Sequence, residues 1–359
     1  MMVSNRRCVL RTCFAFIALG LALSTKVALA IDPAVVAAAK KEGALSYATN
    51  TFAPTTQKEL QAAFRKHYGL PDSFKIDAFV GKSSDVVARV SQEVEAKRVT
   101  VDFVSVNVVT FWHELQDHGE ILKYCSDEYK HLTYRAQTKV LDGGCEFQAL
   151  TVGAFGLMWN PAYIKDDITT WAQLTNPKYK DKIIFGDVRK SAAYLDTYVG
   201  LRENKFWTRD WLEKIKAQNP FFLVRSTDIR DRVMSGEFPV AILAVPRRAY
   251  QVREQVTLKV SFPTDGVVLY GSYAGILKRA PHPNAAKLWT DFLFSKEGQE
   301  ILSRIEAIIS LRSDLNIPAA VKPYLPDLTK IKAAKMDWMG LTEKVRTKYR
   351  NEFRGIFSK

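Results

Sequence analysis

Histidine and cysteine, which often carry catalysis or bind metals, are scarce in this chain: its 359 residues include five histidines and four cysteines. The sequence also contains no Gly-x-Ser-x-Gly elbow, no phosphate-binding P-loop and no dinucleotide-binding fingerprint. A zinc protease needs two histidines on one helical face. Those of His113–His118 are five positions apart, which places them about 140° from each other around a helix. We therefore interpret them as surface histidines and expect no enzyme activity and no cofactor.

The apolar run near the N-terminus is too short to span a bilayer. Residues 14–23 form a run of ten residues, about half of the roughly 20 that a membrane-spanning helix needs. Arg6, Arg7 and Arg11 precede the run and Ala28-Leu29-Ala30 follows it, which is the order of a cleavable export signal. We predict a signal peptide over residues 1–30 and a periplasmic mature chain. An uncleaved anchor is the alternative, and the sequence does not choose between the Sec and twin-arginine routes.

Acidic residues are fewer than basic ones, 38 against 52, and the formal net charge of the chain is +14. Removal of residues 1–30 takes away four basic residues and no acidic one, which leaves 329 residues and a charge of +10. A basic balance is compatible with a negatively charged ligand or with nucleic acid. Because the Lys and Arg residues are scattered and an export signal is present, we expect a small anionic ligand and no nucleic acid.

Two of the four cysteines, Cys8 and Cys13, lie inside the predicted signal peptide. The remaining pair, Cys125 and Cys145, is 20 positions apart and contains no Cys-x-x-Cys spacing. In an exported protein such a pair favours a disulfide, which would contribute about 3 kcal/mol in the chain-entropy model. Two unpaired buried thiols remain the alternative, because sequence separation fixes no distance.

Flexible linkers, low-complexity tracts and internal repeats are absent from the sequence, and strand and helix signals alternate along the mature part. Alternation of this kind predicts an α/β fold with parallel or mixed sheets wrapped by helices. Its length is sufficient for two lobes with separate cores. We expect strands at 44–48, 74–80, 101–106 and 240–245, and helices from 33 to Gly43 and at 56–68, 84–97, 194–202, 207–218 and 228–235.

Four segments, taken in order, resemble the periplasmic solute-binding proteins of ABC importers. They are AKKEGAL ending at Leu45, GKSS at 81–84 with the strand start at 101–102, WAQLTNPKYKDKI at 171–183, and the segment 262–302. The resemblance is to the type II branch that contains ferric-ion, phosphonate and sugar-phosphate binders. It implies two lobes of mixed sheet wrapped by helices, joined by two crossover strands that form a hinge. Lobe 1 would comprise 31–148 plus 272–359, and lobe 2 would comprise 149–271.

Polar residues follow three expected strands of lobe 1. Ser83 and Ser84 stand at a helix start, where unpaired N–H groups bind oxyanions, although a serine there also simply caps a helix. Thr49 and Asn50 follow the first strand, and Asn107 follows the third. Ligands of open α/β sheets bind beyond the carboxyl ends of strands. With the resemblance, we expect these five residues to contact the ligand.

Lobe 2 offers Ser191, near a helix start, and Arg247, after an expected strand. In ferric-binding members of the family the place of Arg247-Arg248 carries adjacent tyrosines. Arginine makes bidentate bonds to carboxylate or phosphate and opposes a bare cation, so we expect an organic anion. We add Tyr250 and Tyr270 as cleft residues; as oxygen donors they form the iron-binding alternative. Two alternatives remain open: that Arg247 and Arg248 are a solvated surface pair, and that Ser191 only caps a helix.

The resemblance thus implies a monomer that closes on a small anionic ligand and presents it to an ABC permease. An iron-binding protein of the same class is the alternative, followed by an exported enzyme on this scaffold and a ligand sensor. Trp207 and Trp211, four positions apart, are expected in a core. We expect the tail at 337–359 to form helices packed on the first lobe.

Overall fold

A computed structural model describes residues 32–358 of the chain. The predicted signal peptide, residues 1–30, lies wholly outside these residues. Within 32–358, no helix is long and apolar enough to span a membrane.

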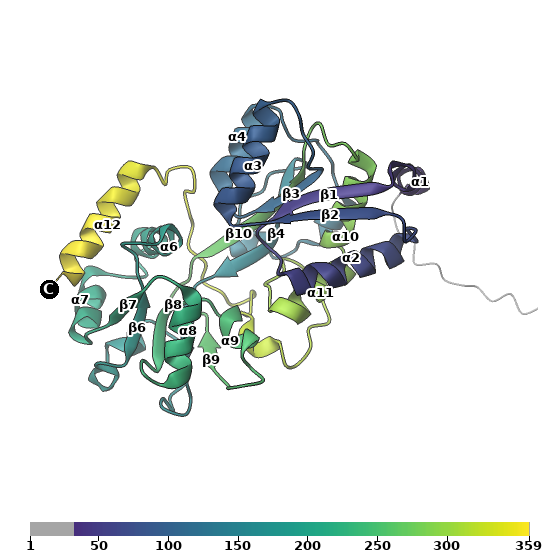
Figure 1. Ribbon diagram of the computed structural model, residues 1–359. Helices are drawn as coiled ribbons and strands as arrows, with labels where there is room; N and C mark the ends of the chain where they lie inside the picture. The colour runs from purple at the N-terminus through teal and green to yellow at the C-terminus, as the bar shows by residue number, and fades with distance from the viewer. Residues whose placement is uncertain (1–31, 359) are drawn as a thin grey trace, which may run out of the picture. The chain divides into compact units, whose positions relative to one another are not determined.

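The first of two five-stranded sheets has the strand order β2-β1-β3-β10-β4. Its strands are β1 (Ala44–Thr49), β2 (Lys75–Val80), β3 (Phe103–Val106), β4 (Phe147–Ala154) and β10 (Leu269–Ile276). β1 pairs in parallel with β2 and β3, whereas β10 runs antiparallel to β3 and β4. Helices α3 (Ser83–Glu95) and α4 (Val109–Asp117) lie on one face. Helices α2 (Pro54–Tyr68), α10 (Pro283–Phe294) and α11 (Lys296–Glu306) lie on the other, with α1 (Pro33–Glu42) beside α10 (Figure 1).

The second sheet has the order β7-β6-β8-β5-β9. Its strands are β5 (Gly156–Trp159), β6 (Ile183–Gly186), β7 (Phe221–Leu223), β8 (Val240–Ala244) and β9 (Lys259–Ser261). Around it pack α6 (Ala192–Glu203), α7 (Arg209–Ala217), α8 (Ser226–Ser235), α9 (Arg247–Gln251) and α12 (Glu343–Phe357). Short helical turns complete the inventory: η1 (Asp127–His131), α5 (Arg135–Thr138), η2 (Ala172–Thr175), η3 (Pro177–Tyr179) and η4 (Lys322–Tyr324). Two mixed sheets wrapped by helices confirm the predicted fold class.

Local sequence signals explain most of these boundaries. Helix α1 begins where the Asp32 carboxylate accepts from the Ala34 N–H and Pro33 occupies the first helical position. It ends at Gly43, whose φ of 72° is a conformation that glycine adopts at little cost. Strands β3, β6 and β8 are buried along their whole length, as expected for largely apolar strands inside a covered sheet.

The chain passes between the two sheets more often than predicted. The expected strand crossovers are present: Phe155 alone separates β4 from β5, and the segment 262–268 connects β9 to β10. A further segment, 307–342, leads from α11, which packs on α2 beside the first sheet, to α12, which packs on α6 and α7 beside the second.

The prediction that the tail packs on the first lobe is therefore wrong. Tyr349, Phe353, Ile356 and Phe357 of α12 belong to the apolar core of the second sheet. An apolar stripe on a helix shows that one face is buried but does not say against which core. Trp207 and Trp211, in contrast, are buried and stacked with ring centroids 4.5 Å apart, which confirms their predicted place in a core.

Cys125 and Cys145 form the predicted disulfide, with their Cα atoms 4.5 Å apart. The bridge joins the segment before η1 to the start of β4, so that it lies entirely within the first lobe.

Candidate functional site

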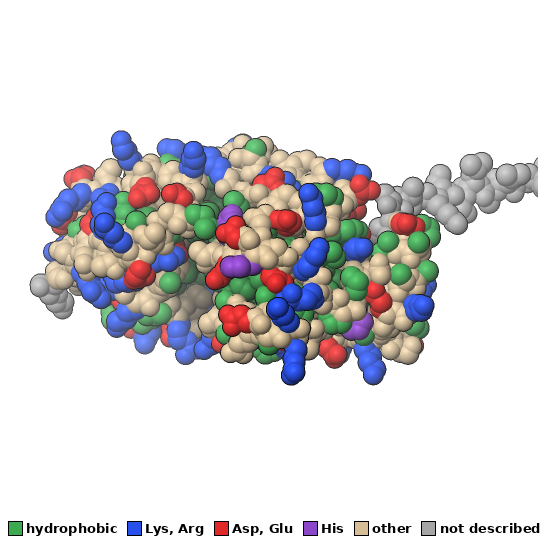
Figure 2. All heavy atoms as spheres, turned by 90° about the horizontal axis from the view of Figure 1, so that it is seen from above, with side chains coloured by type: hydrophobic (Ala, Val, Ile, Leu, Met, Phe, Trp, Pro, Cys, Tyr) green, Lys and Arg blue, Asp and Glu red, His purple; other side chains and the backbone are tan. Residues whose placement is uncertain are grey.

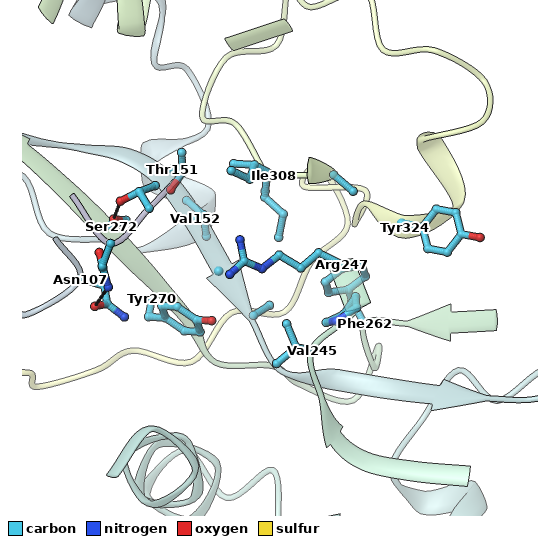
Figure 3. A pocket seen from close by; sticks show the side chains of 17 residues that line it. Asn107, Thr151, Val152, Val245, Arg247, Phe262, Tyr270, Ser272, Ile308 and Tyr324 are labelled. Atoms are coloured by element: carbon cyan, nitrogen blue, oxygen red, sulfur yellow. Dashed lines mark hydrogen bonds between the residues drawn. The ribbon is translucent and has the colours of Figure 1, made fainter. Parts of the chain in front are cut away.

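A cleft lies where the carboxyl ends of β1 and β3 approach the β8–α9 connection of the second lobe. It encloses about 680 Å³ of empty space, part of which is open to solvent. Both lobes and the segment after α11 contribute to its walls, because Asn107, Arg247 and Ile308 all line it (Figure 3).

The first lobe carries a closed triangle of polar side chains at the edge of the cleft, and two of its three members, Asn50 and Asn107, line the cleft. The Asn50 Nδ2 donates to Ser83 Oγ at 2.7 Å and to Asn107 Oδ1 at 2.8 Å. The Ser83 hydroxyl donates to the same Asn107 oxygen at 2.8 Å. Residues that follow β1 and β3 and begin α3 therefore support one another at the edge of the cleft. Mutual support of this kind fixes their positions before a ligand arrives.

Deeper in the same wall, three hydroxyls form a buried chain. Thr51 Oγ1 lies 2.8 Å from Ser105 Oγ and 2.7 Å from Ser272 Oγ. Thr51 and Ser272 line the cleft, together with Thr151 of the neighbouring strand β4. Hydroxyls both donate and accept, so this floor can bond to a ligand's hydroxyl or carboxylate oxygens.

Arg247 supplies the positive charge of the cleft. It is the first residue of α9, and its side chain extends into the pocket toward the wall that holds Asn107, Ser272 and Tyr270 (Figure 3). About a third of the side chain is exposed, and its Nη1 donates to Glu306 Oε2 at 3.1 Å. The remaining N–H groups of the guanidinium can meet a carboxylate or phosphate.

Burial and neighbouring charges shift the pKa values of both Tyr270 and Arg248. Burial raises the pKa of the Tyr270 phenol, and the positive charges of Arg247 and Arg248 act in the opposite direction. Burial, followed by the like charges of Arg247 and Arg230, lowers the pKa of Arg248. The Arg248 side chain donates to the neutral oxygens of Ser226 and Gln251. Because neither of these two hydrogen bonds is to a carboxylate, the Arg248 guanidinium adds positive charge that attracts anions to this side of the cleft.

The cleft brings together four of the residues predicted from the sequence: Asn50, Asn107, Arg247 and Tyr270. Ser83 is not in its wall but is bonded to two residues that are. The other four predicted positions, Thr49, Ser84, Ser191 and Tyr250, do not line it.

Each of these four side chains has another role. Thr49 is fully buried and its hydroxyl accepts from the Thr51 N–H at 2.9 Å. Ser84 donates to its neighbour Asp85. Ser191 caps α6 by accepting from the Tyr194 N–H at 3.4 Å, which is the helix-cap role left open as the alternative to ligand binding. The Tyr250 hydroxyl donates to the Arg304 carbonyl oxygen at 2.5 Å, so it does not join Tyr270 in the pair that the iron alternative requires.

The segment 49–51 after the first expected strand includes Thr51, which lines the cleft, whereas sequence reasoning missed Thr151, Gly153 and Ser272 in the cleft wall. These three lie inside β4 and β10, where nothing in the sequence separates a cleft-facing position from a core one. Gly153 is needed for close approach, because a Cβ there would lie 2.2 Å from the Tyr270 ring. A glycine within a strand can signal such an approach, and this was the available clue.

No group of three or more His, Cys, Asp or Glu side chains suited to a metal ion occurs among residues 32–358. His113 packs edge-on against Phe147, and His118 Nδ1 lies 2.7 Å from the Glu114 carbonyl oxygen at the end of α4.

Two α/β lobes around a cleft that combines hydrogen-bonding side chains, apolar side chains and one arginine define a ligand-binding protein of the two-lobed class. Residues 99–338, more than half of the chain, match the family described as bacterial extracellular solute-binding protein. The chain belongs to this family, and the family resemblance seen in the sequence is confirmed.

Known structures show the same fold at low sequence identity. Iron-bound HitA from Pseudomonas aeruginosa aligns with a TM-score of 0.65 and 18% identity, over 87% of this chain and 99% of its own. AfuA from Actinobacillus pleuropneumoniae, with fructose-6-phosphate bound, gives 0.61 and 20% over 87% and 98%. The substrate-binding protein of an ABC transporter from Agrobacterium tumefaciens gives 0.65 and 14% over 88% and 94%. An uncharacterised protein of Haemophilus influenzae is 26% identical over 340 residues, which cover 90% of this chain and 94% of its own.

Proposed function

We propose that this protein is the periplasmic binding component of an ABC importer and captures a small organic anion bearing a carboxylate, phosphate or phosphonate. The observation that carries the proposal is the make-up of the cleft. Neutral hydrogen-bonding groups of the first lobe face Arg247 of the second, and no Asp or Glu is among the lining residues. Lys and Arg are also interspersed with acidic side chains on the face shown in Figure 2, which supports a small ligand over nucleic acid.

The proposed mechanism is closure of the lobes on the ligand. A ligand that contacts both lobes only in the closed form shifts the equilibrium toward that form. Neutral groups such as Asn107 would bind and orient the anion from one side while Arg247 pairs with its charge from the other. The loaded form would then be presented by a monomer to the membrane permease, and the ligand would be released unaltered.

Iron capture is less well supported. The iron alternative needs phenolate oxygens from Tyr250 and Tyr270, yet the Tyr250 hydroxyl is bonded to a backbone carbonyl outside the cleft wall. Burial also opposes ionisation of Tyr270 by raising its pKa. Arginine beside the site further favours an anion over a bare cation.

A thermal-shift screen tests the function. Carboxylic acids, sugar phosphates, phosphonates and ferric salts would each be added to the mature protein. A ligand at about 100 times its dissociation constant adds roughly 2.7 kcal/mol to the free energy of unfolding. We expect an organic anion to raise the midpoint and Arg247→Ala to abolish the rise.

Arg209→Ala is the matched control, because this exposed arginine of α7 is absent from the cleft wall. It should leave the shift intact. A rise in visible absorbance with ferric salts, without a shift from any anion, would instead favour the iron-binding alternative.

A further inference from the structure

Glu306 is a buried carboxylate that the ligand would not touch. It is the last residue of α11 and is 4% exposed, while the next residue, Ala307, lines the cleft. Its Oε2 accepts from Arg247 Nη1 at 3.1 Å. Its Oε1 accepts from the Ala53 N–H at 2.8 Å and from Thr56 Oγ1 at 2.5 Å.

These partners come from different lobes. Ala53 and Thr56 stand at the start of α2, where a helix N-terminus favours a negative charge. Arg247 begins α9 of the second lobe. Because a buried carboxylate is costly unless its oxygens are bonded, the two donors of α2 keep Glu306 in place. The carboxylate is thus anchored on the first lobe and directed at an arginine of the second.

A parallel contact strengthens the same junction. The Tyr250 hydroxyl of α9 donates to the Arg304 carbonyl oxygen of α11 at 2.5 Å. Helices α9 and α11 are consequently joined at two points, one turn apart on α9, and the orientation of Arg247 depends on how these helices meet.

We propose that Glu306 is a positioning residue for ligand capture. It holds one edge of the Arg247 guanidinium so that the other N–H groups face the cleft, and it transmits the position of the first lobe to the anion contact of the second. A guanidinium is a planar fork, so holding one edge sets the direction of the rest. The inference rests on the proposed function, since it assigns Arg247 to the ligand.

An electrostatic effect of Glu306 on the bound anion acts in the opposite direction. Removing a negative charge close to an anion site would by itself tighten anion binding. Loss of positioning would weaken it. Glu306→Gln distinguishes the two, because the amide keeps the shape and an acceptor for α2 but offers Arg247 no negative charge.

The experiment measures dissociation constants by titration calorimetry with citrate, fructose 6-phosphate and 2-aminoethylphosphonate as probes. Glu306→Gln is expected to weaken binding of the probe that the unaltered protein binds best by about tenfold, a usual size for coupled neighbours. In an Arg247→Lys background, which has no fork to orient, the same change should weaken binding less than about twofold. A merely structural role of Glu306 would produce equal losses in both backgrounds.

Two further variants keep the test decisive. Glu300→Gln, on the same helix but bonded to the Asn316 N–H, should leave the dissociation constants unchanged. Thr56→Val removes one anchor of Glu306 without altering any charge, and it should weaken binding severalfold even if Glu306→Gln does not fold.

If Glu306→Gln binds the probe as tightly as the unaltered protein or more tightly, the inference is overturned and the proposed function still stands. If Glu306→Gln does not fold, the same result with Thr56→Val overturns the inference. Absence of binding of all three probes to the unaltered protein would count against the proposed function, and the inference would fall with it.

Discussion

Individual polar residues in the cleft form hydrogen bonds with residues of other elements. Because such partners are distant in the sequence, only some of the cleft residues could be predicted from it. Asn50 and Asn107 follow strands at the open end of a sheet, where a sequence pattern can locate them. Ser272 faces the cleft from within β10, and Glu306 reaches Arg247 across 59 positions of sequence. Neither relation is expressed in local spacing.

The pKa of Asp291, in the first lobe, also depends on residues that are distant in the sequence. It is 4% exposed in α10, and its Oδ2 accepts from the Tyr124 hydroxyl at 2.6 Å. Burial raises the pKa of this carboxyl to about 6; bonds from Ser126 and Tyr124 oppose that rise, while the charges of Glu128 and Asp127 add to it.

The sign of the effect follows from the raised pKa. Between about pH 4, the unfolded value, and about pH 6, the folded chain binds more protons than the unfolded one. The contribution of Asp291 to the free energy of unfolding is therefore full below pH 4 and is lost as the pH rises through 6. The loss is on the order of 2–3 kcal/mol.

Asp291→Asn should flatten this decline when unfolding by denaturant is followed between pH 4 and 7. Asp210→Asn, at an exposed position of α7, should retain the slope of the unaltered protein. An equally steep decline in Asp291→Asn would contradict the assignment.

Elements were more predictable than contacts. Helices α1, α2 and α3 and strands β1 and β2 lie where apolar periodicity, proline and glycine place them, within one or two residues. Periodicity records which face of an element is buried. It does not record which sheet covers that face, and so α12 was correctly expected to be a helix but was assigned to the wrong lobe.

The place of α12 can be tested through Phe353, which is fully buried against Phe185 and Tyr198 of the second lobe. Phe353→Ala should lower the free energy of unfolding by about 3–5 kcal/mol, the usual cost of removing a buried aromatic ring. Denaturant titration measures it. Arg354→Ala, exposed on the next position, should change it by no more than about 0.5 kcal/mol. Similar small effects from both variants would show that α12 does not complete this core.

At the scale of the whole molecule, the two lobes are linked more extensively than a pair of crossover strands would link them. The chain crosses a third time through 307–342, and the contacts of Arg247 with Glu306 and of Tyr250 with Arg304 join α9 to α11. Family resemblance predicted the two lobes and the cleft, but the third passage depends on where the tail packs.

These links predict cooperative unfolding. The disulfide of Cys125 and Cys145 lies in the first lobe, and its replacement by two alanines should cost about 3 kcal/mol. Because the lobes are linked, we expect calorimetry to show one transition that moves to lower temperature as a unit. A first peak that moves while a second stays in place would show that the lobes unfold independently.

The position of α12 also has a consequence for biosynthesis. Tyr349, Phe353 and Phe357 complete the core around the second sheet, whose first strand, β5, begins at Gly156. A ribosome delivers these aromatic rings nearly two hundred residues after that strand. The second lobe therefore cannot reach its final packing until α12 has been synthesised, and a nascent chain stays unfinished there over that whole interval.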